Sequence, residues 1–233
     1  MRAEGERTIR IYPSLLAADF ANLGKDVAAA QGCGADGIHC DIMDGHFVPN
    51  ITFGPLVVEA IRPLTPLPLY CHLMIEQPER YIKRFVEAGA NEITVQVEAC
   101  PHLHRVLQLI SDAGARCGVA VNPSTSLAAI ENVITDIDVL LIMTVNPGFG
   151  GQSFIESMIP KIARARRMAD DAGVDLDIAV DGGIDVTTAP RVVRAGANLL
   201  IAGTAVFDNG TPVMEACTAL RSSAEAAFDT GKV

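Results

Sequence analysis

The sequence of 233 residues contains no tryptophan, and aromatic residues make up only 5% of it, although 49% of its residues are hydrophobic. Its apolar content therefore comes mainly from Ala, Val, Ile and Leu, as is typical of parallel strands buried on both faces. No apolar run approaches the ~20 residues of a membrane-spanning helix. Residues 1–8 are charged and lack the apolar stretch of a signal peptide. We therefore expect a soluble, cytoplasmic protein with no membrane partner.

The sequence also lacks an excess of basic residues and any regular cysteine spacing. Its formal net charge of -10 argues against a nucleic-acid or anionic-membrane binder, which would need a basic face. The six cysteines form no CxxC pair, so we expect reduced and mostly buried thiols. A phosphorylated metabolite is still a suitable ligand, because backbone amides and helix N-termini bind phosphate locally.

A short repeat runs along the chain and predicts its secondary structure. GCGADGIHC, EAGANEITV, DAGARCGVA and RAGANLLIA each place a glycine two or three residues before an apolar run. Glycine favours the left-handed conformation that ends a helix, so each copy predicts a helix-to-strand turn. The predicted strands cover residues 9–16, 37–44, 68–75, 92–98, 116–122, 139–146, 177–183 and 199–207. The predicted helices cover residues 22–33, 78–88, 102–113, 153–172, 187–195 and 212–228.

This alternation predicts the α/β class and a single-domain (β/α)8 TIM barrel. The barrel would be one catalytic domain over residues 1–233, with residues 1–8 as a short polar N-terminal extension. An open doubly wound sheet is the alternative, but it would rarely need eight such regular units. The sequence contains no linker, low-complexity tract or shift in composition that would mark a second domain.

Four polar side chains stand in or at the end of apolar runs. GIHCDIMDG contains His39 and Asp41, LYCHLMI contains His72, and DIAVDGG contains Asp181. Successive side chains of a strand alternate between its faces, so His39 and Asp41 point the same way. Burying an imidazole beside a carboxylate costs several kcal/mol unless something compensates for it. A divalent metal ion would do so.

The active site of such a barrel lies at the C-terminal ends of its strands, where we expect these four side chains to meet. Imidazole nitrogen together with carboxylate oxygen suits zinc, Fe(II), manganese or cobalt better than calcium or magnesium. A lone buried histidine is more often a hydrogen-bonded core residue, and a lone strand-terminal aspartate is often a helix cap. Four such residues together favour one metal site.

Glycine-rich segments lie at or just after the C-terminal parts of three of the predicted strands. They contain Gly148, Gly150, Gly151, Gly182, Gly183 and Gly203, the last of which precedes Thr204. Glycines let backbone amides approach an anion, and the loops after strands 7 and 8 are the usual phosphate site of this fold. One such loop is weak evidence, because glycines also make turns, but three on one rim favour a phosphate site. Met43, Met74 and Met143 fit a barrel core and an apolar lid over a substrate equally well.

The chain closely resembles the ribulose-phosphate 3-epimerase family. The matching segments are PSLLAADF, GIHCDIMDGHFVPNIT, CHLMI, MTVNPGFGGQSFI, VDGGI and AGTAVF, and they span almost the whole chain. The resemblance implies an isomerase of the pentose-phosphate pathway that reversibly converts D-ribulose 5-phosphate to D-xylulose 5-phosphate. It also implies one divalent metal ion per subunit (zinc, Fe(II), manganese or cobalt). We further expect a homo-oligomer with a sugar-phosphate substrate and no nucleic-acid partner.

The resemblance also assigns roles to individual residues. The metal ligands would be His39, Asp41, His72 and Asp181, and the two aspartates would transfer protons at C3 through a metal-stabilised enediolate. The substrate contacts would be Ser14, His72, Gly148, Phe149, Gly150, Gly151, Asp181, Gly182, Gly183, Gly203 and Thr204. Met43, Met74 and Met143 would cap the reacting carbons. The chain departs from the usual family residues at Gln96 (usually His), Tyr70 (commonly Asp) and Thr204 (more often Ser).

Three other functions stay open on the sequence alone. A D-allulose-6-phosphate 3-epimerase would share the fold and the ligands, although VNPGFGGQ and VDGGI are more similar to the pentose enzyme. A metal-free phosphate-binding lyase or synthase would use its histidines and aspartates in hydrogen bonds. A noncatalytic barrel would keep only the phosphate loops, and it fits least well because both carboxylates and both histidines are intact.

Overall fold

Eight parallel strands form the centre of the molecule. The computed structural model describes residues 7–208 and 210–229, so residues 1–6 of the expected N-terminal extension lie outside the described part. Within that part the strands follow the order β1-β8-β7-β6-β5-β4-β3-β2, and a parallel bridge between Ser14 and His39 joins β1 to β2. The strands are β1 (Arg10–Pro13), β2 (Ile38–Met43), β3 (Leu69–Met74), β4 (Glu92–Gln96), β5 (Arg116–Val121), β6 (Val139–Met143), β7 (Asp177–Asp181) and β8 (Leu199–Ala202).

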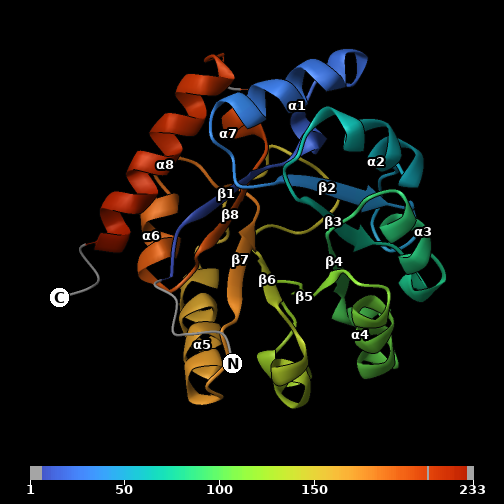
Figure 1. Ribbon diagram of the computed structural model, residues 1–233. Helices are drawn as coiled ribbons and strands as arrows, with labels where there is room; N and C mark the ends of the chain where they lie inside the picture. The colour runs from blue at the N-terminus through green and yellow to red at the C-terminus, as the bar shows by residue number, and fades with distance from the viewer. Residues whose placement is uncertain (1–6, 209, 230–233) are drawn as a thin grey trace.

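Helices surround the strands on the outside (Figure 1). They are α1 (Leu23–Gly32), α2 (Pro55–Ile61), α3 (Ile82–Glu87), α4 (Leu103–Asp112), α5 (Met158–Asp171), α6 (Ala189–Arg194), α7 (Thr204–Phe207) and α8 (Val213–Asp229). The molecule is therefore a single-domain (β/α)8 TIM barrel, as the sequence predicts. In the described part of the chain, no helix is both long and apolar enough to cross a bilayer.

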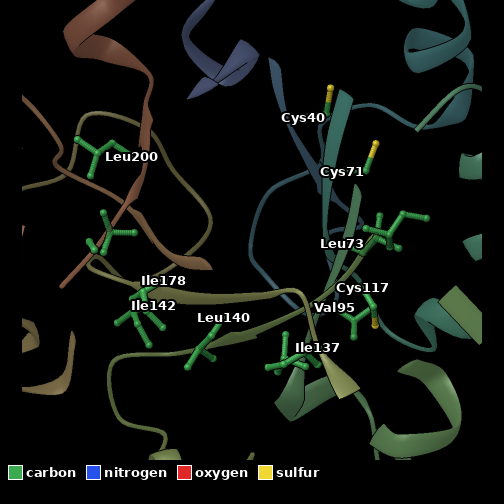
Figure 2. Packing of buried hydrophobic residues seen from close by; sticks show 14 of the residues in the cluster. Cys40, Cys71, Leu73, Val95, Cys117, Ile137, Leu140, Ile142, Ile178 and Leu200 are labelled. Carbon is green, nitrogen blue, oxygen red and sulfur yellow. The ribbon is translucent and has the colours of Figure 1, made fainter. Parts of the chain in front are cut away.

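The strands bury both of their faces, in two separate apolar layers. Leu140 and Ile142 on β6 belong to the large outer layer between strands and helices, part of which is shown in Figure 2. Their neighbours Leu141 and Met143 point inward and join a smaller cluster inside the barrel. This alternation explains why β6 is a continuous aliphatic run. It also means that a polar residue on an inward position is enclosed by the barrel.

The N-terminal ends of the strands are closed by a network of charged side chains. Arg116 Nη1 donates to Glu92 Oε2 at 2.8 Å, and its Nη2 donates to Asp177 Oδ2 at 2.5 Å. Tyr12 Oη donates to Glu92 Oε1 at 2.7 Å, and Arg10 forms an ion pair with Asp177. Glu92 is buried, and its charge is balanced by a cation and a hydroxyl donor. These ion pairs and hydrogen bonds close this end of the barrel, which lies opposite the end where the active site is expected.

The ends of several predicted elements differ from the structure, and some elements of the structure were not predicted. The predicted strand 199–207 is wrong at its end, because the chain turns at Gly203 and residues Thr204–Phe207 are helical. The predicted helix 153–172 begins only at Met158, because Ile155 N in the preceding segment donates instead to the carbonyl of Thr144, the residue that follows β6. Between β5 and β6 the described chain forms short 3₁₀ turns. Helix α2, which starts with Pro55 at its first position, was not predicted.

Candidate metal centre

Four side chains converge inside the barrel. His39 and Asp41 come from β2, His72 from β3 and Asp181 from the end of β7. Each offers one ligand atom, and these four atoms all lie within 4.8 Å of one another. Both imidazoles are fully buried, and Asp41 is only 3% exposed. The structure thus brings together the four residues that the sequence singles out as metal ligands.

Two imidazole nitrogens in this cluster have no hydrogen-bond partner among the described residues. They are His39 Nε2 and His72 Nδ1, and both are buried. His72 Nδ1 lies 3.7 Å from Asp41 Oδ1 and 3.8 Å from Asp181 Oδ2, which is too far for a hydrogen bond. Buried polar atoms normally have a hydrogen-bond partner. A buried ring nitrogen that faces two carboxylates and has no such partner is suited to bind a cation. The buried His/Asp group can therefore hold a metal ion.

Asp41 is held on one side by hydrogen bonds. Ser14 Oγ donates to Asp41 Oδ2 at 2.5 Å, and His39 Nδ1 lies 3.1 Å from the same oxygen. Ser14 follows directly after β1, and its bridge to His39 brings it beside Asp41. The other oxygen, Oδ1, faces His72. The carboxylate is thus fixed in orientation, with one oxygen turned toward the remaining ligands.

The two aspartates differ in their electrostatic surroundings. Burial alone would raise the pKa of Asp41, but the charge and hydrogen bond of His39, and then the contacts of His72, hold that pKa below its usual range. Burial raises the pKa of Asp181 to about 7, and the negative charge of Asp41 acts in the same direction. Near neutral pH the protein alone therefore keeps Asp41 ionised and Asp181 partly protonated. An ionised and a protonated carboxyl group are what proton removal and proton return require.

A pocket adjoins the cluster at the C-terminal end of the barrel. Most of the expected substrate contacts line it, namely Ser14, Gly148, Phe149, Gly150, Gly151, Asp181, Gly182, Gly183, Gly203 and Thr204. Asp41 also lines this pocket, so both carboxylates border it. His39 and His72 are not among the lining residues, and both are completely buried. The structure therefore places the carboxylates, rather than the imidazoles, next to the space for a substrate.

The glycine-rich loops after β6 and β7 contact each other closely. Gly183 has a φ of 64°, and a Cβ atom there would lie 2.6 Å from the backbone nitrogen of Phe154. Gly182 has a φ of 115°, and its Cβ would lie 2.3 Å from the side chain of Val145. A side chain at either position would separate the two loops. The close approach leaves backbone rather than side chains at this border of the pocket.

Several residues that support these loops were missed by the sequence reasoning. Asn50 Nδ2 donates to Gly148 O at 2.8 Å, and Gln152 Nε2 donates to Phe149 O at 2.8 Å. Thr144 Oγ1 donates to Gly182 O at 2.6 Å. All three lie within the segments FVPN and MTVNPGFGGQ. Each donates to a backbone carbonyl oxygen, and no sequence pattern indicates which carbonyl that is.

The three methionines of the sequence analysis are both buried and part of the pocket lining. Met43 and Met74 pack with Val48, whereas Met143 belongs to the cluster inside the barrel. All three line the pocket. These methionines are therefore both core residues of the barrel and part of the pocket wall. That they cap a bound substrate stays a prediction.

Two of the departures from the family pattern contact the metal-ligand candidates. The ring of Tyr70 packs edge-on against His39, with ring centroids 4.9 Å apart, and its hydroxyl accepts a hydrogen bond from Thr94. The side chain of Gln96 reaches His72, where the two Nε2 atoms lie 3.0 Å apart. The third departure, Thr204, lines the pocket.

Fold and site together define a class: (β/α)8 barrels in which a buried His/Asp cluster able to bind a metal lies beside a glycine-lined pocket. The sequence profile of the ribulose-phosphate 3 epimerase family matches residues 10–207. The chain belongs to the ribulose-phosphate 3-epimerase family.

Named relatives agree with this membership. A ribulose-phosphate 3-epimerase of Bacillus subtilis is 58% identical over 200 residues, which cover 85% of this chain and 92% of the relative. A ribulose-phosphate 3-epimerase of Synechocystis sp. is 51% identical over 219 residues, covering 93% and 95%. Among solved structures, 3-hexulose-6-phosphate synthase from Salmonella typhimurium is similar with a TM-score of 0.72 and 16% identity, covering 94% of this chain and 100% of that one. At that identity the structural likeness bears on the fold alone.

Proposed function

We propose that this protein is a metal-dependent ribulose-phosphate 3-epimerase, which interconverts D-ribulose 5-phosphate and D-xylulose 5-phosphate. The observation that carries the proposal is the convergence of two buried histidines and two aspartates on one point beside the pocket. Family membership over residues 10–207 supports it independently.

Inversion at C3 needs one group that removes a proton and another that returns one to the opposite face. Asp41 on β2 and Asp181 on β7 border the pocket from different strands of the barrel. In the proposed reaction Asp41 removes the C3 proton of D-ribulose 5-phosphate, and Asp181 donates a proton to the other face. Their roles exchange in the reverse direction.

His39, Asp41, His72 and Asp181 would hold one divalent ion per subunit, for which zinc, Fe(II), manganese and cobalt are the candidates. When bound, the ion would supply Lewis-acid stabilisation of the negative charge that develops on the substrate oxygens. Ser14 keeps Asp41 oriented through its hydrogen bond and would contact the substrate at the edge of the pocket.

The phosphate group would bind at the glycine side of the pocket. Its contacts would be the backbone amides of residues 148–151, of Gly182, Gly183 and Gly203, and the hydroxyl and amide of Thr204. Met43, Met74 and Met143 would cover the reacting carbons and exclude water from them.

Homo-oligomer formation, a cytoplasmic location and one catalytic domain over residues 1–233 stay predictions of the sequence.

D-Allulose 6-phosphate is the alternative substrate, and the names of the relatives do not favour it. We expect metal-loaded enzyme to form D-xylulose 5-phosphate from D-ribulose 5-phosphate in a coupled assay. Because one additional carbon unit in a fitted pocket changes specificity by about 10- to 200-fold, kcat/KM for D-allulose 6-phosphate should be lower by a factor in that range. Dominant hexulose turnover would favour the alternative, and no turnover of either sugar with any of the metals would contradict both assignments.

A further inference from the structure

Gln96 is the one polar side chain that reaches the back of His72 in the described hydrogen-bond network. The two residues lie on neighbouring strands, β4 and β3, and both are fully buried. The Nε2 atoms of the two side chains are 3.0 Å apart, whereas the other ring nitrogen of His72 faces Asp41 and Asp181. Gln96 therefore contacts the imidazole at the nitrogen that points away from the cluster.

The hydrogen-bond partners of the two side chains are mutually dependent. A neutral imidazole carries one N–H, so the hydrogen bond at Nε2 decides which nitrogen keeps a free lone pair. If the Gln96 amide nitrogen donates to Nε2, the ring proton sits on Nδ1. There it would find no acceptor in reach, because the nearest carboxylate oxygens are 3.7 and 3.8 Å away. In that arrangement Gln96 Oε1 is also buried without a partner.

Rotating the amide of Gln96 by about 180° exchanges its oxygen and nitrogen, which have nearly the same shape. His72 Nε2–H then donates to Gln96 Oε1, and Nδ1 keeps its lone pair toward the two carboxylates. The rotation gives the buried oxygen a donor and leaves the ring nitrogen free to bind a cation, while the amide nitrogen moves to the position that Oε1 occupies here. The neighbouring polar group on β4, the Thr94 hydroxyl, donates to Tyr70 rather than contacting His72 in the described hydrogen-bond network.

We infer that Gln96 is a positioning residue, which accepts a hydrogen bond from His72 Nε2 through its side-chain oxygen and so holds His72 in the tautomer that can bind a metal through Nδ1. The inference rests on the proposed metal site. Its specific content is that residue 96 must supply an acceptor, so a carboxylate can replace the amide there and an apolar side chain cannot. In metal sites, loss of such an outer partner typically weakens metal affinity by about 10- to 100-fold.

The test compares Gln96→Met, which keeps the length but removes the acceptor, with Gln96→Glu, which keeps the acceptor and removes the donor. Gln108→Met, at an exposed position of α4, is the matched control. Cobalt and zinc dissociation constants are measured by competition with a chelator on the full chain, and thermal unfolding checks that each variant folds. We expect Gln96→Met to bind metal about 10- to 100-fold more weakly. Gln96→Glu and Gln108→Met should lose less than about 10-fold in metal affinity.

Equal weakening by Gln96→Met and Gln96→Glu would overturn the inference, because it would mean that the amide nitrogen donates. Unchanged affinity in Gln96→Met would overturn it as well. Long-range ¹H–¹⁵N spectra of the His72 ring give a readout independent of variants, and they should show the proton on Nε2; a proton on Nδ1 in the metal-loaded protein would contradict the assignment. If the original protein binds no metal, the proposed metal site fails and the role of Gln96 falls with it.

Discussion

Asp41→Asn and Asp181→Asn should each lower kcat for D-ribulose 5-phosphate by about 10³-fold or more. Asparagine has almost the same shape as aspartate, but its amide cannot take up or deliver the C3 proton. Both carboxylates border the pocket, and each would serve one face of the substrate. Both carboxylates act in each direction of the reaction. Each variant should therefore lose about as much activity in the forward direction as in the reverse direction. Coupled assays in both directions measure this.

Metal content decides how the result is interpreted, because the same two side chains are proposed ligands. Each variant is therefore assayed with saturating metal, and its bound metal is measured on the assayed sample. Asp112→Asn, at an exposed position of α4, is the matched control and should keep full turnover. If Asp41→Asn or Asp181→Asn bound a full equivalent of metal and still turned over at the original rate, the two-carboxylate mechanism would be wrong.

Arg116→Met should lower the free energy of unfolding by about 3 kcal/mol. This is the lower end of the loss found when one partner of a buried ion pair is removed. The Arg116 side chain contacts Glu92, whose side chain is 3% exposed, and Asp177, whose side chain is 13% exposed. Without the guanidinium, the hydrogen bond from Tyr12 is the one side-chain contact of Glu92 that remains in the described hydrogen-bond network. Urea unfolding followed by circular dichroism gives the free energy. Turnover per folded molecule should stay unchanged, since this network lies at the opposite end of the barrel from the pocket.

Lys83→Met is the matched control for this substitution. Its ion pair with Glu87 is exposed, with side-chain exposures of 84% and 54%, so its loss should have little effect. Adding Glu92→Gln to Arg116→Met removes the unpaired buried charge and should recover part of the lost stability. A loss below about 1 kcal/mol in Arg116→Met would contradict this prediction, because exposed surface ion pairs contribute no more than that.

The metal-ligand candidates could be predicted because they interrupt strands whose other residues are strongly apolar. His39 and Asp41 alternate with Ile38, Cys40 and Ile42, so strand periodicity puts both polar side chains on one face, which is the inward face in the structure. The barrel followed from the regular glycine turns before the strands. Local patterns therefore gave the fold and the four converging side chains.

Contacts that depend on register or on distant pairing could not be read from local patterns. The hydrogen bond between Gln96 and His72 joins residues 24 positions apart, and the ion pair of Arg116 with Asp177 joins residues 61 positions apart. Helix α7 was predicted as strand because TAVF is a short apolar run that fits either state. In the structure the chain turns at Gly203, which separates β8 from helix α7.

The central claim is that a metal held by the buried His/Asp cluster is needed for epimerisation at C3. The most direct test is turnover of D-ribulose 5-phosphate by the same enzyme sample before chelation, after chelation and after stoichiometric addition of zinc, Fe(II), manganese or cobalt. We predict that metal removal lowers the rate by at least about 10²-fold and that at least one of these ions restores it. Full turnover by protein that analysis shows to be free of metal would contradict the account.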